Sequence, residues 1–196
     1  MRLFVSGGCK NGKSSFAEAF AVAQVKPGQP LYYLATMLPK DQEDQERIQR
    51  HRLQRADHAF QTVEIPGKIL QVLQTCDPQG CFLLDSTTAL LENAMFLPDG
   101  SVNLAAGENL GADLATLLDH LEQITIVSDY LGSDAFFYDP LTEAFRRSLA
   151  QIDRILASKC DAVVEICASQ PIIHKGQDFF LPDHLPKASS GAGGVR

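Results

Sequence analysis

Short apolar runs alternate along the chain with longer segments in which apolar residues recur at helical spacing. A short apolar run bounded by polar or turn residues is typical of a buried strand. The segment 60–64 instead alternates between apolar and polar residues, which predicts an edge strand. The expected buried strands are 3–6, 31–35, 81–84, 124–127 and 162–167.

The segments between these runs predict helices. After Lys13, apolar residues recur at Phe16, Ala19, Phe20 and Ala23, which is the spacing of one helical face. Because buried strands alternate with helices, we expect an α/β fold in which a mainly parallel sheet is covered on both faces, giving three layers. The expected helices begin at 13 and cover 42–55, 68–73, 86–96, 112–121 and 140–156.

Length and composition favour one folded domain. The chain has 196 residues, of which 45% are hydrophobic and 21% are charged, and these values are ordinary for a globular protein of one domain. We expect this domain to cover residues 1–176. The remainder, 177–196, contains a stretch rich in glycine, alanine and serine and predicts a flexible tail.

Charge and cysteine content narrow the class of protein. Lysine and arginine number 17 against 24 for aspartate and glutamate, a net charge of −7 that argues against a nucleic-acid-coating surface. No run approaches the ~20 apolar residues of a membrane span. The five cysteines are scattered and form no C-x-x-C pair, so free thiols in a reducing cytoplasm are the simpler interpretation.

A glycine-rich segment between the first strand and the first helix fits the motif G-x-x-x-x-G-K-[ST]. Its glycines let successive backbone N–H groups point at phosphate oxygens, and the helix N-terminus adds positive charge. Lys13 would reach the β- and γ-phosphates, and Ser14 would ligate Mg²⁺. The alternative is a glycine-rich turn with an incidental lysine. The loop, which predicts a fold of the P-loop NTPase type, consists of Gly7, Gly8, Cys9, Lys10, Asn11, Gly12, Lys13 and Ser14.

Such a loop needs a carboxylate that holds the metal, usually at the end of a neighbouring buried strand. Asp85 directly follows the apolar run 81–84 and is the best candidate. The alternative role for Asp85 is to cap the helix that begins at Ser86, since aspartate is a common N-cap residue. The two roles are compatible with each other.

A second candidate site lies in the charged segment 41–55, in which acidic residues precede basic ones. That order suits the helix macrodipole, so a solvated surface helix is one interpretation. However, Arg47, His51 and Arg55 are four residues apart and share a helix face. Flanking cations keep an imidazole neutral and nucleophilic and also bind phosphate oxygens. The segment therefore also fits a histidine that attacks phosphorus.

Taken together, these motifs resemble those of one enzyme family. They are the loop G-G-x-x-x-G-K-S at 7–14, Y-[IL]-A-T at 33–36, R-I-x-x-H-[RK] at 47–52, T-[VA]-E at 62–64, and a strand end at 84–88. In this order they resemble the bifunctional adenosylcobinamide kinase / adenosylcobinamide-phosphate guanylyltransferases of cobalamin biosynthesis, over residues 1 to about 176.

The resemblance implies two reactions. Phosphoryl transfer from ATP or GTP, assisted by Lys13 and Mg²⁺, would phosphorylate the hydroxyl of adenosylcobinamide. His51 would then attack the α-phosphorus of GTP and carry GMP to the phosphorylated corrinoid. The resemblance also implies a homotrimer. Besides the loop, the nucleotide-binding residues implied are Ala35, Thr36, Met37, Arg52, Leu53, Gln54, Arg55, Glu64 and Asp85, with Ser14 and Asp85 at the metal.

The second half of the chain departs from the family pattern. Where the family has N-E-V-G-x-G-I-V-P, residues 128–135 read SDYLGSDA, and the family's G-x-x-N-Q is replaced at 150–154 by AQIDR. Two other functions therefore stay open: a small-molecule or nucleoside kinase with another acceptor, and a non-catalytic protein that binds nucleotide.

Overall fold

The described part of the chain folds around a seven-stranded sheet with the order β3-β2-β4-β5-β1-β6-β7. A computed structural model describes residues 1–39, 42, 49, 59–132 and 135–180. Six strands are parallel, and β7 runs antiparallel to β6. The strands are β1 (Arg2–Gly7), β2 (Leu31–Ala35), β3 (Phe60–Glu64), β4 (Cys81–Asp85), β5 (Ile124–Asp129), β6 (Ala162–Cys167) and β7 (Gln170–Lys175).

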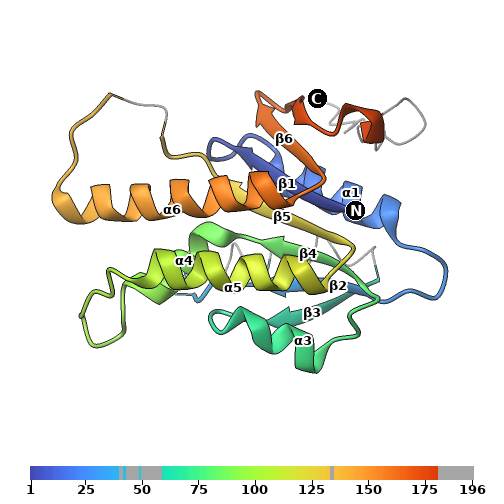
Figure 1. Ribbon diagram of the computed structural model, residues 1–196, viewed down its shortest axis with the longest axis horizontal. Helices are drawn as coiled ribbons and strands as arrows, with labels where there is room; N and C mark the ends of the chain where they lie inside the picture. The colour runs from blue at the N-terminus through green and yellow to red at the C-terminus, as the bar shows by residue number, and fades with distance from the viewer. Residues whose placement is uncertain (40–41, 43–48, 50–58, 133–134, 181–196) are drawn as a thin grey trace, which may run out of the picture.

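Helices cover both faces of this sheet, which confirms the expected three-layer α/β fold (Figure 1). In that view α4, α5 and α6 lie in front of the sheet and α1 lies behind it. No helix in the described ranges is long and apolar enough to cross a bilayer. The helices are α1 (Lys13–Gln24), η1 (Ile69–Gln71), α3 (Val72–Thr75), α4 (Thr87–Met95), α5 (Ala106–His120), α6 (Pro140–Lys159) and η2 (Gln177–Phe180).

Alternation along the strands divides the core in two. In β4, for example, Phe82 and Leu84 pack with α4, α5 and α6, whereas Cys81 and Leu83 pack with α1. Successive strand residues point to opposite faces, so a continuous apolar run serves both layers. All five cysteines are free thiols, and burial raises the pKa of the Cys81 thiol to about 11.

Helix α5 begins six residues before the expected start at 112, at Ala106. Gly107 and Gly111 lower the helical propensity of this first part. However, a Cβ at Gly107 would collide with Ser148 of α6, so the two helices touch at a point where only glycine fits. Tertiary packing therefore overrides local propensity.

Strand β7 was not expected from the sequence. The turn that joins it to β6 consists of Ala168 and Ser169, which both have positive φ, as in a tight hairpin, although neither residue signals such a turn. Pro171 is tolerated because β7 is an edge strand. Beyond the expected domain boundary at 176, η2 continues the fold, and its Phe180 is buried against Phe20 of α1.

Candidate nucleotide-binding site

The glycine-rich segment forms the predicted strand, loop and helix at the carboxyl edge of the sheet. Strand β1 ends at Gly7, and α1 begins at Lys13. Gly12 precedes the helix with a φ of 93°, a left-handed conformation that favours glycine. Its carbonyl accepts the first helical hydrogen bond, from the N–H of Phe16 at 3.0 Å. The loop therefore leads directly into a helix N-terminus, the usual position for binding phosphate.

Two neighbouring strands hold the loop in place. On one side, the Nδ2 of Asn11 donates to the carbonyl oxygen of Ile166 in β6. On the other side, the N–H of Tyr130 donates to the carbonyl oxygen of Gly7 at 2.9 Å. Because both anchors use backbone carbonyls at the ends of strands, the sheet itself positions the loop.

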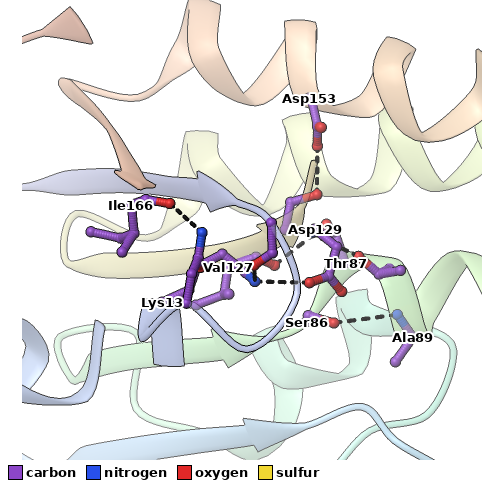
Figure 2. A network of polar contacts seen from close by, with 12 residues as sticks. Lys13, Ser86, Thr87, Ala89, Val127, Asp129, Asp153 and Ile166 are labelled. Atoms are coloured by element: carbon purple, nitrogen blue, oxygen red, sulfur yellow. Dashed lines mark hydrogen bonds and ion pairs between the residues drawn. The ribbon is translucent and has the colours of Figure 1, made fainter. Parts of the chain in front are cut away.

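Lys13 lies beneath the loop and is almost completely buried, with 7% of its side chain exposed. Its Nζ donates to the carbonyl oxygen of Gly8 at 2.6 Å and lies 2.9 Å from the Oδ1 of Asp129. Figure 2 shows the side chains of Lys13 and Asp129 in this network of polar contacts at the strand ends. The buried ammonium is thus oriented by one carbonyl and one carboxylate.

Asp85 ends β4, two strands away from β1. Its Oδ2 accepts a hydrogen bond from the hydroxyl of Tyr33 at 3.2 Å. The N-cap of α4 is Ser86, whose Oγ accepts from the N–H of Ala89 at 3.4 Å. The alternative role for Asp85 as the helix cap is therefore wrong, because the next residue supplies the cap.

The segment after β2 is fastened to the start of α4. The Oγ1 of Thr36 accepts from the N–H of Ser86 at 2.8 Å and lies 2.9 Å from the carbonyl oxygen of Ser86, to which it donates. Asn93 donates from Nδ2 to the carbonyl oxygens of Thr36 at 2.8 Å and Pro66 at 3.0 Å. These bonds fix Thr36, and with it the end of β2, to the start of α4.

The loop and these strand ends enclose a cavity of about 830 Å³. Gly7 and Gly8 belong to the loop but are not among the residues that line it. The candidate residues that the structure brings together around the cavity are Cys9, Lys10, Asn11, Gly12, Lys13, Ser14, Ala35, Thr36, Met37, Glu64 and Asp85. The candidates His51, Arg52, Leu53, Gln54 and Arg55, together with Arg47, lie outside the described residues.

The donor set at this cavity fits a magnesium ion. Ser14 and Asp85 both line it and present a hydroxyl and a carboxylate oxygen. Mg²⁺ prefers such hard oxygen ligands and completes its coordination with water and substrate phosphates. Ser14 at the start of α1 and Asp85 at the end of β4 therefore present the type of ligand that a bound Mg²⁺ requires.

Residues to which the sequence analysis assigned no nucleotide or metal contact also line the cavity, among them Tyr33, Thr62, Ser86 and Asp129. Asp129 follows the apolar run 124–127 after one serine, much as Asp85 follows 81–84. A search for every carboxylate at the end of an expected strand would have found it. Its neighbour Ser128 points to the opposite face of the sheet.

Ser128 donates from Oγ to the Oδ1 of Asp153 in α6 at 2.7 Å (Figure 2). Burial raises the pKa of the Asp153 carboxyl to about 6, the hydrogen bond from Ser128 opposes that rise, and the charge of Asp129 adds to it. Two consecutive residues of β5 thus connect the cavity on one face to α6 on the other.

The sequence profile of the cobinamide kinase / cobinamide phosphate guanyltransferase family matches residues 3–173. The chain is 29% identical over 185 residues to the bifunctional adenosylcobalamin biosynthesis protein CobP of Pseudomonas aeruginosa, covering 90% of this chain and 99% of that protein. It is 25% identical over 174 residues to the bifunctional adenosylcobalamin biosynthesis protein CobU of Escherichia coli, covering 83% of this chain and 93% of that protein.

Among solved structures, the KaiC-like protein PH0186 from Pyrococcus horikoshii has a similar fold. Its TM-score is 0.50 at 14% sequence identity, with coverage of 89% of this chain and 78% of that chain. At this identity the similarity concerns the fold alone.

Proposed function

Since the chain belongs to the cobinamide kinase / cobinamide phosphate guanyltransferase family, we propose that it catalyses two steps of cobalamin biosynthesis. The first phosphorylates the hydroxyl of adenosylcobinamide, and the second transfers GMP from GTP to the resulting phosphate. The observation that carries the proposal is the gathering of loop residues 9–14, Ala35–Met37, Glu64 and Asp85 around one cavity.

In the phosphoryl transfer, ATP or GTP would bind with its phosphates in the loop. Backbone N–H groups at the start of α1 would bind the phosphate oxygens, and the ammonium of Lys13 would stabilise the negative charge that develops on the γ-phosphoryl group. Ser14 and Asp85 would hold Mg²⁺, which would supply neutralisation of the negative charge on the phosphates. The burial of Lys13 supports this role, because a desolvated charge acts more strongly on a nearby phosphate.

For the guanylyl transfer, we assign the nucleophile to His51 on the strength of the family resemblance and of its spacing with Arg47 and Arg55. A ring nitrogen of His51 would form a bond to the α-phosphorus of GTP, the bond from that phosphorus to the bridging oxygen would break, and pyrophosphate would leave. The GMP group would then pass to the phosphate of the corrinoid, restoring free imidazole.

The test of the second step is the mass of the intact protein after exposure to GTP and Mg²⁺. We expect the mass to increase by one GMP, with an adduct that is labile in acid and stable in base. His51→Ala should form no adduct. His120→Ala is the matched control, because His120 lies at the end of α5 and is exposed, and it should be labelled like the wild type. Wild-type protein that stays unlabelled would exclude guanylyl transfer through histidine.

The first step is tested by the mass of the corrinoid product. Adenosylcobinamide with ATP or GTP should yield its phosphate, and GTP should then yield the GDP-linked corrinoid. Nucleotide hydrolysis or transfer to another hydroxyl, without any corrinoid product, would favour a kinase with a different acceptor. Nucleotide binding without any turnover would favour a non-catalytic protein.

From the same resemblance we propose that the protein acts in the cytoplasm as a homotrimer. Light scattering of the purified protein should give three times the chain mass of 21.4 kDa. A catalytically competent monomer would contradict this assembly.

A further inference from the structure

Two carboxylates end neighbouring strands at the cavity, and the proposed function uses only one of them. Asp85 ends β4 and Asp129 ends β5. Leu83 and Val127, each two residues earlier, both pack in the core on the α1 face. Because side chains alternate along a strand, Asp85 and Asp129 point to that same face. Both line the cavity.

The two carboxylates have different partners and different positions. Asp85 pairs with Val127 in the strand register, so Asp129 lies two residues, or about 7 Å, further along the strand direction. Asp85 accepts a hydrogen bond from the Tyr33 hydroxyl, whereas the Oδ1 of Asp129 lies 2.9 Å from the Nζ of Lys13. Asp129 therefore lies beside the cation that loops of this type use to bind the transferred phosphoryl group.

The backbone of Asp129 is fixed on three sides. Its N–H donates to the Oγ1 of Thr88 at 3.0 Å, and in the sheet register it pairs with Gly7, the first residue of the loop. The next N–H, from Tyr130, donates to the Gly7 carbonyl. The preceding side chain, Ser128, is bonded to Asp153. A carboxylate held in this way is pre-oriented for a reacting group.

The side chain of Asp129 nevertheless stays accessible from the cavity. It is 31% exposed, whereas the Lys13 side chain is 7% exposed. A substrate hydroxyl that approaches a γ-phosphoryl group held by Lys13 would therefore meet a carboxylate oxygen. The Lys13 ammonium contacts Oδ1, and the carboxylate has a second oxygen that can accept a hydrogen bond from that hydroxyl.

We propose that Asp129 is the catalytic base of the phosphoryl transfer, an inference that rests on the proposed function. The acceptor hydroxyl donates a hydrogen bond to the Asp129 carboxylate. Its oxygen forms a bond to the γ-phosphorus, the bond from that phosphorus to the β,γ-bridging oxygen breaks, and the nucleoside diphosphate leaves. The hydroxyl proton passes to Asp129, which releases it to solvent after product departure.

This role predicts that one substitution separates the two reactions. Attack of His51 on GTP removes no proton from an acceptor hydroxyl, and the acceptor in the second transfer is already an ionised phosphate. Asp129→Asn keeps the size of the side chain and an oxygen that can accept from Lys13, but it removes the base. We expect kcat for phosphorylation of adenosylcobinamide to fall by about 10²–10⁴-fold. The KM for nucleotide and the rate of GMP adduct formation should change by no more than about tenfold, since the amide oxygen still accepts from Lys13 and only the charge of that contact is lost.

Asp85→Asn is the matched comparison. As a residue that would hold Mg²⁺, Asp85 should serve both reactions, so its variant should lose phosphorylation and adduct formation together. Asp129→Glu retains a carboxylate and should recover part of the phosphorylation that Asp129→Asn loses. Thermal unfolding of each variant checks that the fold is intact.

The outcomes distinguish this inference from the proposed function. If the wild type makes no phosphorylated corrinoid, the proposed function fails. If the wild type is active and Asp129→Asn phosphorylates at a similar kcat, Asp129 is not the base. Equal loss of phosphorylation and of adduct formation in Asp129→Asn would also overturn the inference, because it would show that Asp129 acts only by orienting Lys13.

Discussion

The two faces of the sheet are built differently. On the face that α4, α5 and α6 cover, large side chains such as Leu114, Leu117 and Ile152 are completely buried in a continuous apolar core. On the opposite face, α1 packs over the middle of the sheet, and its first residue, Lys13, lines a cavity of about 830 Å³ together with Asp85 and Asp129 at the ends of β4 and β5. Burial of apolar area stabilises both faces, but at the strand ends the second face also keeps polar groups accessible to a ligand.

This contrast indicates that stability and nucleotide chemistry can be changed separately. The two faces meet at β5, where Ser128 contacts α6 and Asp129 contacts Lys13. Substitutions on the face covered by α4, α5 and α6 should lower the free energy of unfolding and leave the chemistry of the folded protein intact. Substitutions of polar residues at the cavity should mainly lower nucleotide binding or the rates of the two proposed transfers.

The largest effect is expected for Leu117→Ala. Leu117 lies in α5 and is fully buried, so its truncation removes apolar contacts and leaves a cavity. We expect the free energy of unfolding in urea to fall by about 2–5 kcal/mol, while the folded protein binds GTP as before. Leu104→Ala is the control, because Leu104 is 68% exposed. Similar losses for both variants would mean that α5 does not carry the core of this face.

Lys13→Ala tests the opposite face. Without the buried ammonium, both proposed transfers should fall by about 10²–10³-fold, since one pre-oriented charge on the phosphates is lost. The melting temperature should change little. Lys26→Ala, an exposed lysine just beyond the end of α1, should keep both activities. Guanylyl transfer that persists in Lys13→Ala would show that GTP binds in a second mode, away from the loop.

Asp153→Asn tests the junction between the faces through pH. The pKa of the Asp153 carboxyl is raised from 3.8 to about 6 in the folded protein, so folding favours its protonated form. The stability that the protonated Asp153 contributes to the wild type should therefore be lost as pH rises from 4 to 6 and should stay lost above that. Asparagine mimics the protonated acid, so the variant should be more stable than the wild type by about 1–3 kcal/mol above pH 6 and similar to it near pH 3.5.

The measurement is the melting temperature of both proteins from pH 3.5 to 8. Asp119→Asn is a control of opposite sign, because the hydrogen bond from Lys159 lowers the pKa of the Asp119 carboxyl. That variant should lose stability relative to wild type above pH 4, and the difference should vanish at low pH. A stability difference between Asp153→Asn and the wild type that does not change with pH would contradict a raised pKa for the Asp153 carboxyl.

The smallest effect is expected at a helix cap. Ser86→Ala removes the side chain that caps α4 and should cost about 1 kcal/mol of unfolding free energy. Asp139→Ala removes the cap of α6, where one carboxylate oxygen accepts from the N–H groups of Leu141 and Thr142, and should also lower the free energy of unfolding. Ser86 lines the cavity, so only its variant should also weaken GTP binding, as measured by calorimetry. Equal GTP binding by both variants would mean that the position of Thr36 does not depend on the Ser86 cap.

Much of the fold follows from local patterns. The apolar run 124–127 could be assigned to a buried strand because its neighbours are polar or turn residues. The edge position of β3 followed from the alternation in 60–64. Strand β7 could not be predicted, because Gln170–Lys175 contains a proline and follows a turn without glycine or asparagine. Its place depends on pairing with β6.

Part of the candidate site could be predicted from the sequence, and part could not. The loop 7–14 has a sequence signature because its backbone conformation requires particular residues, such as glycine at position 12. Asp129 has no signature of that kind. Its significance comes from the 2.9 Å contact with Lys13, a residue 116 positions earlier in the chain.

The sequence alone thus determined the six parallel strands, the phosphate-binding loop and the family, because each of these depends on residues close together in the chain or on motifs in a set order. The tertiary structure decided which side chains meet. The parallel strands bring Lys13, Asp85 and Asp129 to one edge, and the alternation along β5 sends Ser128 and Asp129 to opposite faces. Contacts of that kind depend on strand order and register, which no local pattern encodes.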